Sequence, residues 1–141
     1  GSHLPKPFEA HGPVKRRMTD PRSLFQVEII AEWVKVQGFH IKDMGLLASA
    51  IERPWLRFGN RDLYPDVWHK AAAVLDSIES SHPLHDGNKR IGVLLCLLML
   101  ASHGVDDEVL AEDDLFDLAC DVAKYHPEVS VIAAHLRRLA S

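Results

Sequence analysis

Apolar residues recur along most of this chain at the three- and four-residue spacing that is typical of amphipathic helices. The first such pattern starts at Leu24 and stops at Gly38, a residue type that commonly ends a helix. Later segments repeat the pattern between prolines and glycines that interrupt it. Together these segments predict amphipathic helices at residues 24–37, 44–52, 65–81, 111–124 and 129–139.

One further predicted helix is different, because it lacks a polar face. It extends from Asn88 to Gly104, and residues 91–101 within it form the longest apolar run of the chain. A helix that is apolar all round is buried on every side, so we expect it at the centre of a bundle. Residues 53–62 contain proline, glycine and asparagine and predict an irregular loop or a small hairpin. The predicted fold class is therefore all-α, a single bundle with a buried central helix and a small flap.

Length and charge narrow the possible functions. The 141 residues fit one domain, which we expect at 23–141, after a tag remnant and a loose leader at 1–22. A net charge of −4 without a basic stripe argues against nucleic acid as a partner. The longest apolar run is too short for a membrane span, and no signal peptide is recognisable. We therefore expect a cytoplasmic protein whose two cysteines, Cys96 and Cys120, stay reduced.

The most informative stretch is the polar loop before the apolar helix, His82-Pro83-Leu84-His85-Asp86-Gly87-Asn88-Lys89-Arg90. Backbone N–H groups at a helix N-terminus and the helix dipole favour a bound anion there. The expected phosphate-binding residues are Gly87, Asn88, Lys89 and Arg90. Asp86 can bind Mg²⁺ together with phosphate oxygens, and His82 can remove a proton from a hydroxyl. A base, a metal ligand and a phosphate site thus lie within nine residues.

Each of these residues alone has an ordinary structural explanation, but two basic residues in a first helical turn oppose the helix dipole and favour a compensating anion. One alternative is a metal-dependent phosphohydrolase site of His82, His85 and Asp86 with His69, which leaves residues 87–90 without a role. Another alternative is a catalytically silent binding module. The presence of both His82 and Asp86 argues against it.

The loop resembles the signature of the Fic family, H-P-F-x-[D/E]-G-N-x-R, and with lysine at position 89 it is most similar to the Doc toxins. The flanking sequence agrees, since residues 62–65 open a helix upstream and an apolar helix follows. The resemblance covers about residues 24–138. It implies an all-helical Fic fold, a bacterial or phage toxin of a toxin–antitoxin pair, and ATP and Mg²⁺ as cosubstrates.

Carried over to this sequence, the resemblance implies that His82 is the general base and Asp86 the metal ligand, and that residues 87–90 bind the phosphates. Leu84 stands where the family usually has a phenylalanine that anchors the loop in the core, and leucine buries comparably. Residues 53–62 occupy the place of a flap that aligns the target chain by strand pairing. The flap residues expected to position the target are Arg53, Trp55, Phe58 and Asn60.

Two positions bear on the group that is transferred. Lys89 replaces a glycine of the AMP-transferring members, and Val93 stands where those members carry a further arginine. Doc toxins are similar in both respects, and they phosphorylate a threonine of elongation factor Tu. The resemblance thus favours transfer of the γ-phosphate of ATP to a threonine or serine of a translation protein such as elongation factor Tu. AMP transfer to a protein hydroxyl is the alternative.

The resemblance also implies a partner. No inhibitory segment of the form S/T-x-x-x-E-[G/N] is visible in the chain, which favours an inhibitor acting in trans. We expect a small, partly disordered Phd-like antitoxin that folds as a helix over a groove. The groove would be bordered by residues 24–37 and by the flap.

Overall fold

The computed structural model describes residues 21–141, so the predicted tag remnant and leader lie outside the described residues except for Pro21 and Arg22. The described part is helical throughout, apart from one short hairpin. The helices are α2 (Pro21–Leu24), α3 (Val27–Val36), α4 (Met44–Glu52), α5 (Val67–Ser81), α6 (Asn88–Ser102), α7 (Glu112–Tyr125) and α8 (Val129–Leu139). The shorter elements are η1 (Arg53–Trp55), β1 (Arg57–Phe58), β2 (Arg61–Asp62) and η2 (Asp107–Val109). The predicted all-α fold is confirmed.

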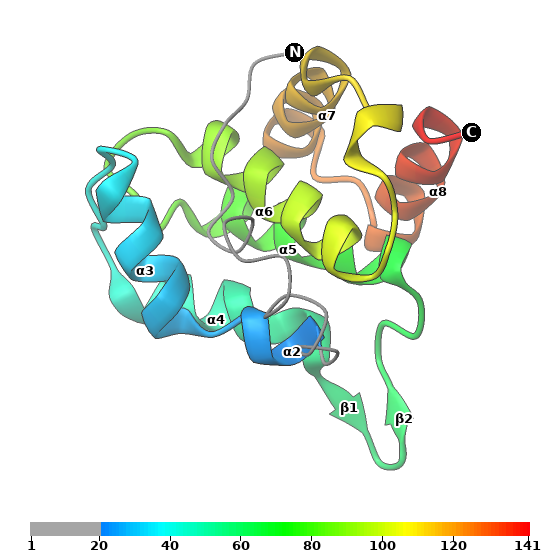
Figure 1. The fold of residues 1–141 in the computed structure, drawn as a ribbon, viewed down its shortest axis with the longest axis horizontal. Coiled ribbons are helices and arrows are strands. Elements are labelled where there is room, and N and C mark those ends of the chain that lie inside the picture. Colours follow the sequence, from blue (N-terminus) through cyan, green and yellow to red (C-terminus); the bar gives the residue numbers. More distant parts are fainter. Residues whose placement is uncertain (1–20) are drawn as a thin grey trace, which may run out of the picture.

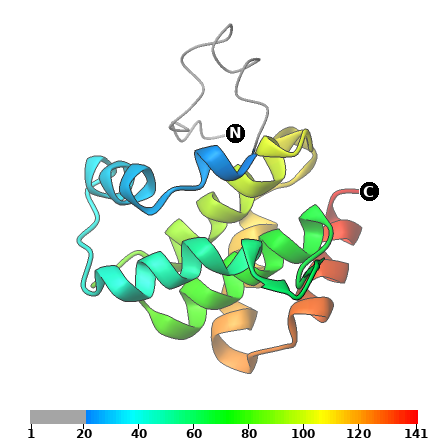
Figure 2. The same ribbon diagram turned by 90° about the horizontal axis from the view of Figure 1, so that it is seen from below.

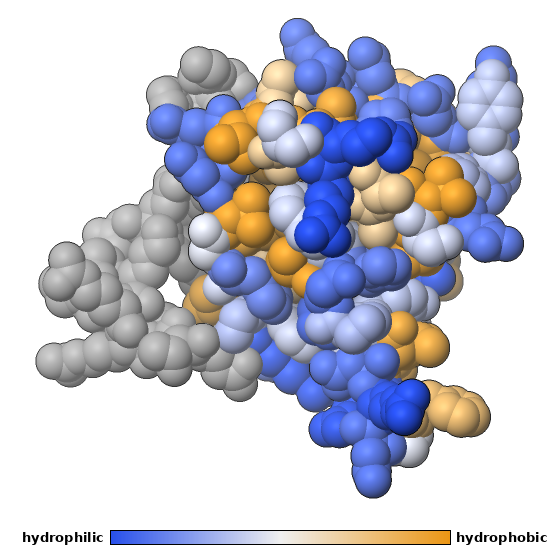
Figure 3. Space-filling view, turned by 90° about the vertical axis from the view of Figure 1, so that its right-hand side faces the viewer, coloured by the Kyte–Doolittle hydropathy of each residue, from blue (hydrophilic) through white to orange (hydrophobic). Residues whose placement is uncertain are grey.

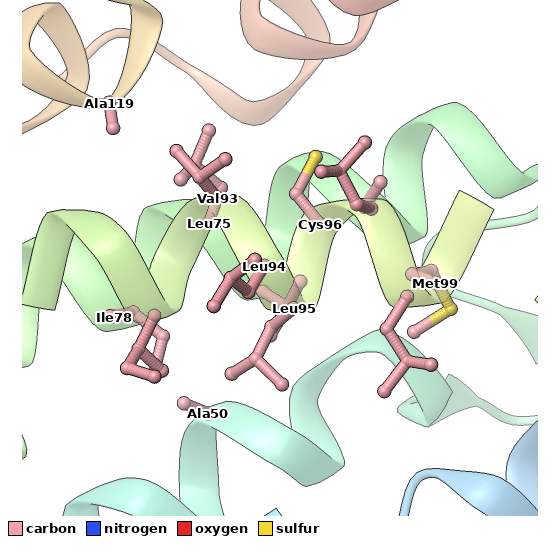
Figure 4. Packing of buried hydrophobic residues seen from close by; sticks show 14 of the residues in the cluster. Ala50, Leu75, Ile78, Val93, Leu94, Leu95, Cys96, Met99 and Ala119 are labelled. Atoms are coloured by element: carbon pink, nitrogen blue, oxygen red, sulfur yellow. The ribbon is translucent and has the colours of Figure 1, made fainter. Parts of the chain in front are cut away.

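Helix α6 is the centre of the bundle, as its sequence predicts. Every residue from Ile91 to Leu100 is buried. Figure 4 shows Ala50 of α4 on one side of this helix and Ala119 of α7 on the opposite side. The core thus surrounds the middle of α6, and the exposed residues of the helix, Lys89 and Arg90, lie at its N-terminal end.

The segment predicted as one helix at residues 24–37 is broken in the structure. Gln26 is extended (φ −109°, ψ 137°) and separates α2 from α3. Leu24 and Phe25 are adjacent and both buried, whereas a helix with one apolar stripe buries neighbouring positions poorly. The break directs the Phe25 ring into the core, where it meets Trp55 edge-on with the ring centroids 6.5 Å apart.

The start of α5 also differs from the prediction, which placed Pro65 in its first turn. The helix begins at Val67, and Asp66 caps it by accepting a hydrogen bond of 2.9 Å from the His69 N–H. Pro65 therefore lies just outside the helix. The aspartate side chain accepts a hydrogen bond from a free N–H group at the start of the helix, whereas a proline side chain has no acceptor atom.

The hairpin of β1 and β2 lies within the predicted flap. Its strands pair antiparallel, with Arg57 opposite Asp62 and Phe58 opposite Arg61, and Gly59 at its tip has a positive φ of 62°. The hairpin projects from the bundle at the N-terminal end of α5 (Figures 1 and 2). The loop that joins α5 to α6 lies at the other end of α5, and a helix of 15 residues is about 22 Å long.

The surface has no single dominant apolar patch in the view of Figure 3, where hydrophilic residues cover most of the face and hydrophobic ones form separate groups. Among the described helices, none combines the length and the apolar character that a bilayer span requires. Cys96 and Cys120 are both free, and Cys96 is buried.

Candidate active site

The loop between α5 and α6 begins with His82, the residue that ends α5. His82 adopts the left-handed conformation (φ 52°, ψ 62°), and its N–H donates a hydrogen bond to the Ile78 carbonyl. Such a conformation costs an L-residue about 1–2 kcal/mol. His126 ends α7 in the same way, so the backbone conformation alone does not mark a functional residue. The His82 side chain is exposed to solvent, where it can meet a substrate.

The loop is held by main-chain pairing with residues 40–43, which connect α3 to α4. The Pro83 carbonyl accepts hydrogen bonds of 2.8 and 3.0 Å from two N–H groups of that connection, and the His85 N–H donates one of 3.0 Å to a carbonyl there. The side chain of Leu84 is 1% exposed. The leucine thus anchors the loop in the core, as predicted for this position.

The side chain of Asn88 is used within the loop. Its Oδ1 accepts a hydrogen bond from the Leu84 N–H, and its Nδ2 donates one to the Leu84 carbonyl, both at 3.0 Å. The sequence predicted Asn88 as a phosphate-binding residue. In this structure its side chain fixes the shape of the loop, and its backbone N–H has no acceptor among the described residues.

The local structure requires a glycine at position 87, and the sequence did not reveal why. Its φ of 87° is in the left-handed region, and a Cβ atom built on it would lie 2.2 Å from the Phe39 ring. Any larger residue would have to displace that ring. The glycine therefore lets the backbone turn into α6 in direct contact with Phe39, a residue that carries no signal of its own in the sequence.

The N-terminus of α6 has the free donors that anion binding requires. The helix has no side-chain cap, and its first intrahelical bond runs from the Ile91 N–H to the Gly87 carbonyl. The backbone N–H groups of Asn88, Lys89 and Arg90 have no acceptor among the described residues. The Lys89 and Arg90 side chains are exposed, and neither forms an ion pair within the described chain. These groups together form a candidate anion site, with the donors and positive charges that a phosphate requires.

Asp86 lies beside this anion site and is exposed. One of its carboxylate oxygens accepts a hydrogen bond of 2.8 Å from the Gly87 N–H. In the described part of the chain, no three histidine, cysteine, aspartate or glutamate side chains gather in a way that could hold a metal ion. Mg²⁺ commonly binds through one or two carboxylates and the phosphates of its substrate, so the arrangement around Asp86 fits this ion only when a nucleotide supplies further oxygens.

His69 is not near this loop. It lies in the first turn of α5, where its ring Nδ1 is 2.9 Å from the Asp66 carboxylate, and His82 ends the same helix about 20 Å further on. The structure therefore does not bring His69 together with His82, His85 and Asp86. A phosphohydrolase site made of these four residues is not formed.

The predicted flap residues fall into two groups, one that packs against the helices and one on the hairpin. Arg53 and Trp55 face the helical body: the Arg53 guanidinium is 2.6 Å from the Asp76 carboxylate, and the Trp55 ring stacks on His103. Phe58, on β1, is 83% exposed. Asn60 lies in the turn of the hairpin, at the opposite end of α5 from His82.

Glu79 is a buried carboxyl group that the sequence analysis did not single out. Its side chain is fully buried, and neither carboxyl oxygen has a hydrogen-bond partner. Gly92 of α6 lies against it, since a Cβ atom at Gly92 would be 2.3 Å from Glu79 Oε2. Burial raises the pKa of Glu79 to about 7, and the charge of Lys89 lowers it in part. The sequence did contain an indication that Glu79 is buried, because this residue follows Ile78 and lies one turn after Leu75 on the apolar side of its helix.

The bundle and its loop define the class of this protein. The chain matches the sequence model of the Fic/DOC family over residues 21–100, which includes the whole loop, and it belongs to that family. It is similar to a protein named Toxin Doc from Mycolicibacterium smegmatis, with 36% identity over 104 residues that cover 72% of this chain and 78% of the relative. The resemblance predicted from the loop is confirmed.

Glu79 generates a prediction about the pH dependence of stability. Because its pKa is about 7 in the folded protein and 4.5 in its ordinary state, the folded protein binds the proton more tightly. Stability is therefore expected to fall as pH rises from about 4.5 to 7, by up to roughly 3 kcal/mol. The free energy of unfolding, measured with urea at pH 5 and at pH 8, should decrease less between the two pH values for Glu79→Gln than for the wild type.

The matched control is Glu28→Gln, which removes an exposed carboxyl from α3. This control should keep the pH dependence of the wild type. If stability depended on pH in the same way in the wild type and in Glu79→Gln, Glu79 would not be the group responsible.

Proposed function

We propose that this protein is a Doc-type toxin that transfers the γ-phosphate of ATP to a threonine or serine hydroxyl of a translation protein, such as elongation factor Tu. Growth arrest is the expected consequence. The observation that carries the proposal is an exposed His82 at the start of the loop that leads into α6, whose first turn has backbone N–H groups without acceptors among the described residues and the exposed side chains of Lys89 and Arg90. Family membership and the similarity to Toxin Doc support it.

In the proposed reaction, the N-terminus of α6 with Lys89 and Arg90 binds the phosphates and orients them. The hydroxyl oxygen of the target forms a bond to the γ-phosphorus, and the bond from that phosphorus to the β–γ bridging oxygen breaks. The hydroxyl proton passes to the His82 imidazole, and ADP leaves. Asp86 would hold a Mg²⁺ ion, which would supply positive charge to the phosphates. Positioning and charge stabilisation account for most of the catalysis in reactions of this kind.

Two side chains support phosphate transfer over AMP transfer. Lys89 adds a cation to the first turn of α6, and its side chain is exposed there. Val93 is 5% exposed and supplies no cation to a terminal phosphate. Both features disfavour a nucleotide position in which the α-phosphorus meets the hydroxyl, because a small change of position decides which bond breaks.

The position of the label on the target distinguishes the two reactions. The protein is incubated with bacterial lysate, or with purified elongation factor Tu, and with ATP labelled at either the α- or the γ-phosphate. We expect label from the γ-phosphate alone on the target, and a mass increase of one phosphate. A target heavier by one AMP would assign the protein to the AMP-transferring members of the family.

The second prediction concerns the base. His82→Ala should reduce the rate of transfer roughly 10²–10⁴-fold, because it removes a general base, while ATP binding and the unfolding midpoint stay close to those of the wild type. His85→Ala is the matched control, since His85 is exposed in the same loop and contributes its backbone N–H. A His82→Ala variant with full activity would remove His82 from the mechanism.

The third prediction concerns an antitoxin. Ile29 and Val36 of α3 are 38% and 73% exposed, and a spacing of seven residues puts them on one face of the helix. The connection that follows α3 pairs with the loop that begins with His82, so α3 is joined directly to the candidate site. We therefore expect α3 to be one border of the antitoxin site.

The test uses the small protein whose co-expression relieves the growth arrest. Ile29→Asp together with Val36→Asp should abolish its co-purification with the toxin. Phe58→Asp tests the other predicted border of the groove, at the hairpin. Retained binding by the α3 variant would show that the partner does not use this helix.

A further inference from the structure

Glu79 is a buried titratable group to which the proposed reaction assigns no role. It lies near the C-terminal end of α5, its side chain is fully buried, and neither carboxyl oxygen has a hydrogen-bond partner. A charged carboxyl group without partners is unfavourable in a protein interior. Packing alone would therefore favour an apolar side chain at this position.

Two helices place Glu79 close to the candidate anion site. On α5 it precedes His82 by three residues, which is less than one helical turn. On α6 it packs against Gly92, where there is no room for a Cβ atom beside Glu79 Oε2. Lys89 precedes Gly92 by three residues and therefore lies on the same side of α6. Between Asn88 and Gly92 the axis of α6 rises about 6 Å, so the carboxyl group lies about one helical turn from the free N–H groups of the first turn.

Lys89 is electrostatically linked to Glu79. Burial raises the pKa of Glu79 to about 7, and the positive charge of Lys89 lowers it in part. The Lys89 side chain is exposed, and within the described chain it forms no ion pair with Glu79. The Lys89 ammonium can therefore turn towards a bound anion or towards Glu79, but it cannot neutralise both at once.

The other charged groups of the elements packed against α5 are paired elsewhere or at least partly exposed. Arg53 of η1 pairs with Asp76 at 2.6 Å, and the buried Cys96 thiol of α6 stays neutral, because burial raises its pKa to about 12. The remaining titratable groups are Arg90 of α6, Glu52 of α4, residues 112–114, 117, 120, 121, 124 and 125 of α7, and His135, Arg137 and Arg138 of α8. Among the described residues, Lys89 is the one whose charge acts on the pKa of Glu79.

We infer that Glu79 is a positioning residue of the anion site, and that phosphate binding there is coupled to the uptake of a proton by the Glu79 carboxyl group. Neutral Glu79 leaves Lys89 free to contact the bound anion. Charged Glu79 attracts Lys89 away from the anion and also repels the anion directly. Binding therefore favours the carboxylic acid, and the proton comes from solvent. The inference rests on the proposed function and adds control of the same site by pH.

The direction of the pH dependence follows from the pKa of about 7. Below this pH the carboxyl group is already neutral in the free protein and has little effect on anion affinity. Above it, the free protein carries a negative charge that must be neutralised when an anion binds. The affinity for phosphate is therefore expected to fall as pH rises through 7, by roughly tenfold for two charges about one helical turn apart.

The first experiment measures the binding of inorganic tripolyphosphate by calorimetry at pH 6 and at pH 8.5, for the wild type, Glu79→Gln and Glu28→Gln. Tripolyphosphate itself loses protons in this range, and comparison of the variants at the same pH cancels that effect. Between the two pH values we expect the affinity of the wild type to fall roughly tenfold more than that of Glu79→Gln. Glu28→Gln is the matched control, because Glu28 is an exposed carboxyl group of α3, and it should follow the wild type. An equal change in all three proteins would overturn the inference.

The second experiment uses the wild type and needs no folded variant. The carboxyl ¹³C resonance of Glu79 is followed as a function of pH, with and without saturating tripolyphosphate. We expect the titration midpoint to move to higher pH by about one unit when the anion is bound. A purely structural role of Glu79 would leave the midpoint unchanged, and that result would overturn the inference.

The two experiments also separate the inference from the proposed function. Tripolyphosphate binding without this coupling, together with γ-phosphate transfer to the target, would overturn the role of Glu79 and leave the proposed function standing. A wild-type protein that binds no tripolyphosphate at either pH would overturn both.

Discussion

The burial of ten consecutive residues of α6, from Ile91 to Leu100, organises the whole bundle. The exposed residues of this helix, Lys89 and Arg90, are therefore confined to its N-terminal end. At the N-terminal end, backbone N–H groups without acceptors coincide with the positive end of the helix dipole and with two cationic side chains. The core thereby creates an anion site, and the loop from His82 to Gly87 places a histidine and an aspartate at its edge.

Some residues of this loop hold its backbone in place, and others expose side chains that can react or bind. Leu84 is buried, Asn88 bonds to the main chain of Leu84, and Gly87 packs against Phe39. These contacts leave little freedom for the backbone that carries the free N–H groups, and rigid support of this kind holds a binding site in one geometry. His82, Asp86, Lys89 and Arg90 remain exposed. Substitution of Leu84, Gly87 or Asn88 should therefore impair function even if these side chains never contact a substrate.

Glu79 shows that the core beneath the site is not optimised for stability. A carboxyl group without hydrogen bonds in an apolar interior opposes folding when it is charged. Its position against Gly92, with the Lys89 charge close enough to affect its pKa, couples the interior of the bundle to the first turn of α6. On the α7 side of the same helix, Arg90 lines a cavity. The N-terminal half of α6 thus lies between an interior acid and the candidate anion site.

The sequence by itself determined the all-α fold, the central helix and the loop before it, because helical periodicity and an uninterrupted apolar run are local properties. The nine-residue loop signature also sufficed to indicate the family. The contacts between distant segments were decided by the tertiary structure alone. The break at Gln26 depends on where Phe25 meets Trp55, and the fit of Gly87 depends on Phe39. The resemblance to the Fic family implied that residues 53–62 form a flap at the site, whereas in the structure the hairpin projects at the N-terminal end of α5, the opposite end of that helix from His82. The pairing of α7 with the start of α6, which forms the cavity beside Arg90, depends on packing between segments more than twenty residues apart, and no local pattern encodes it.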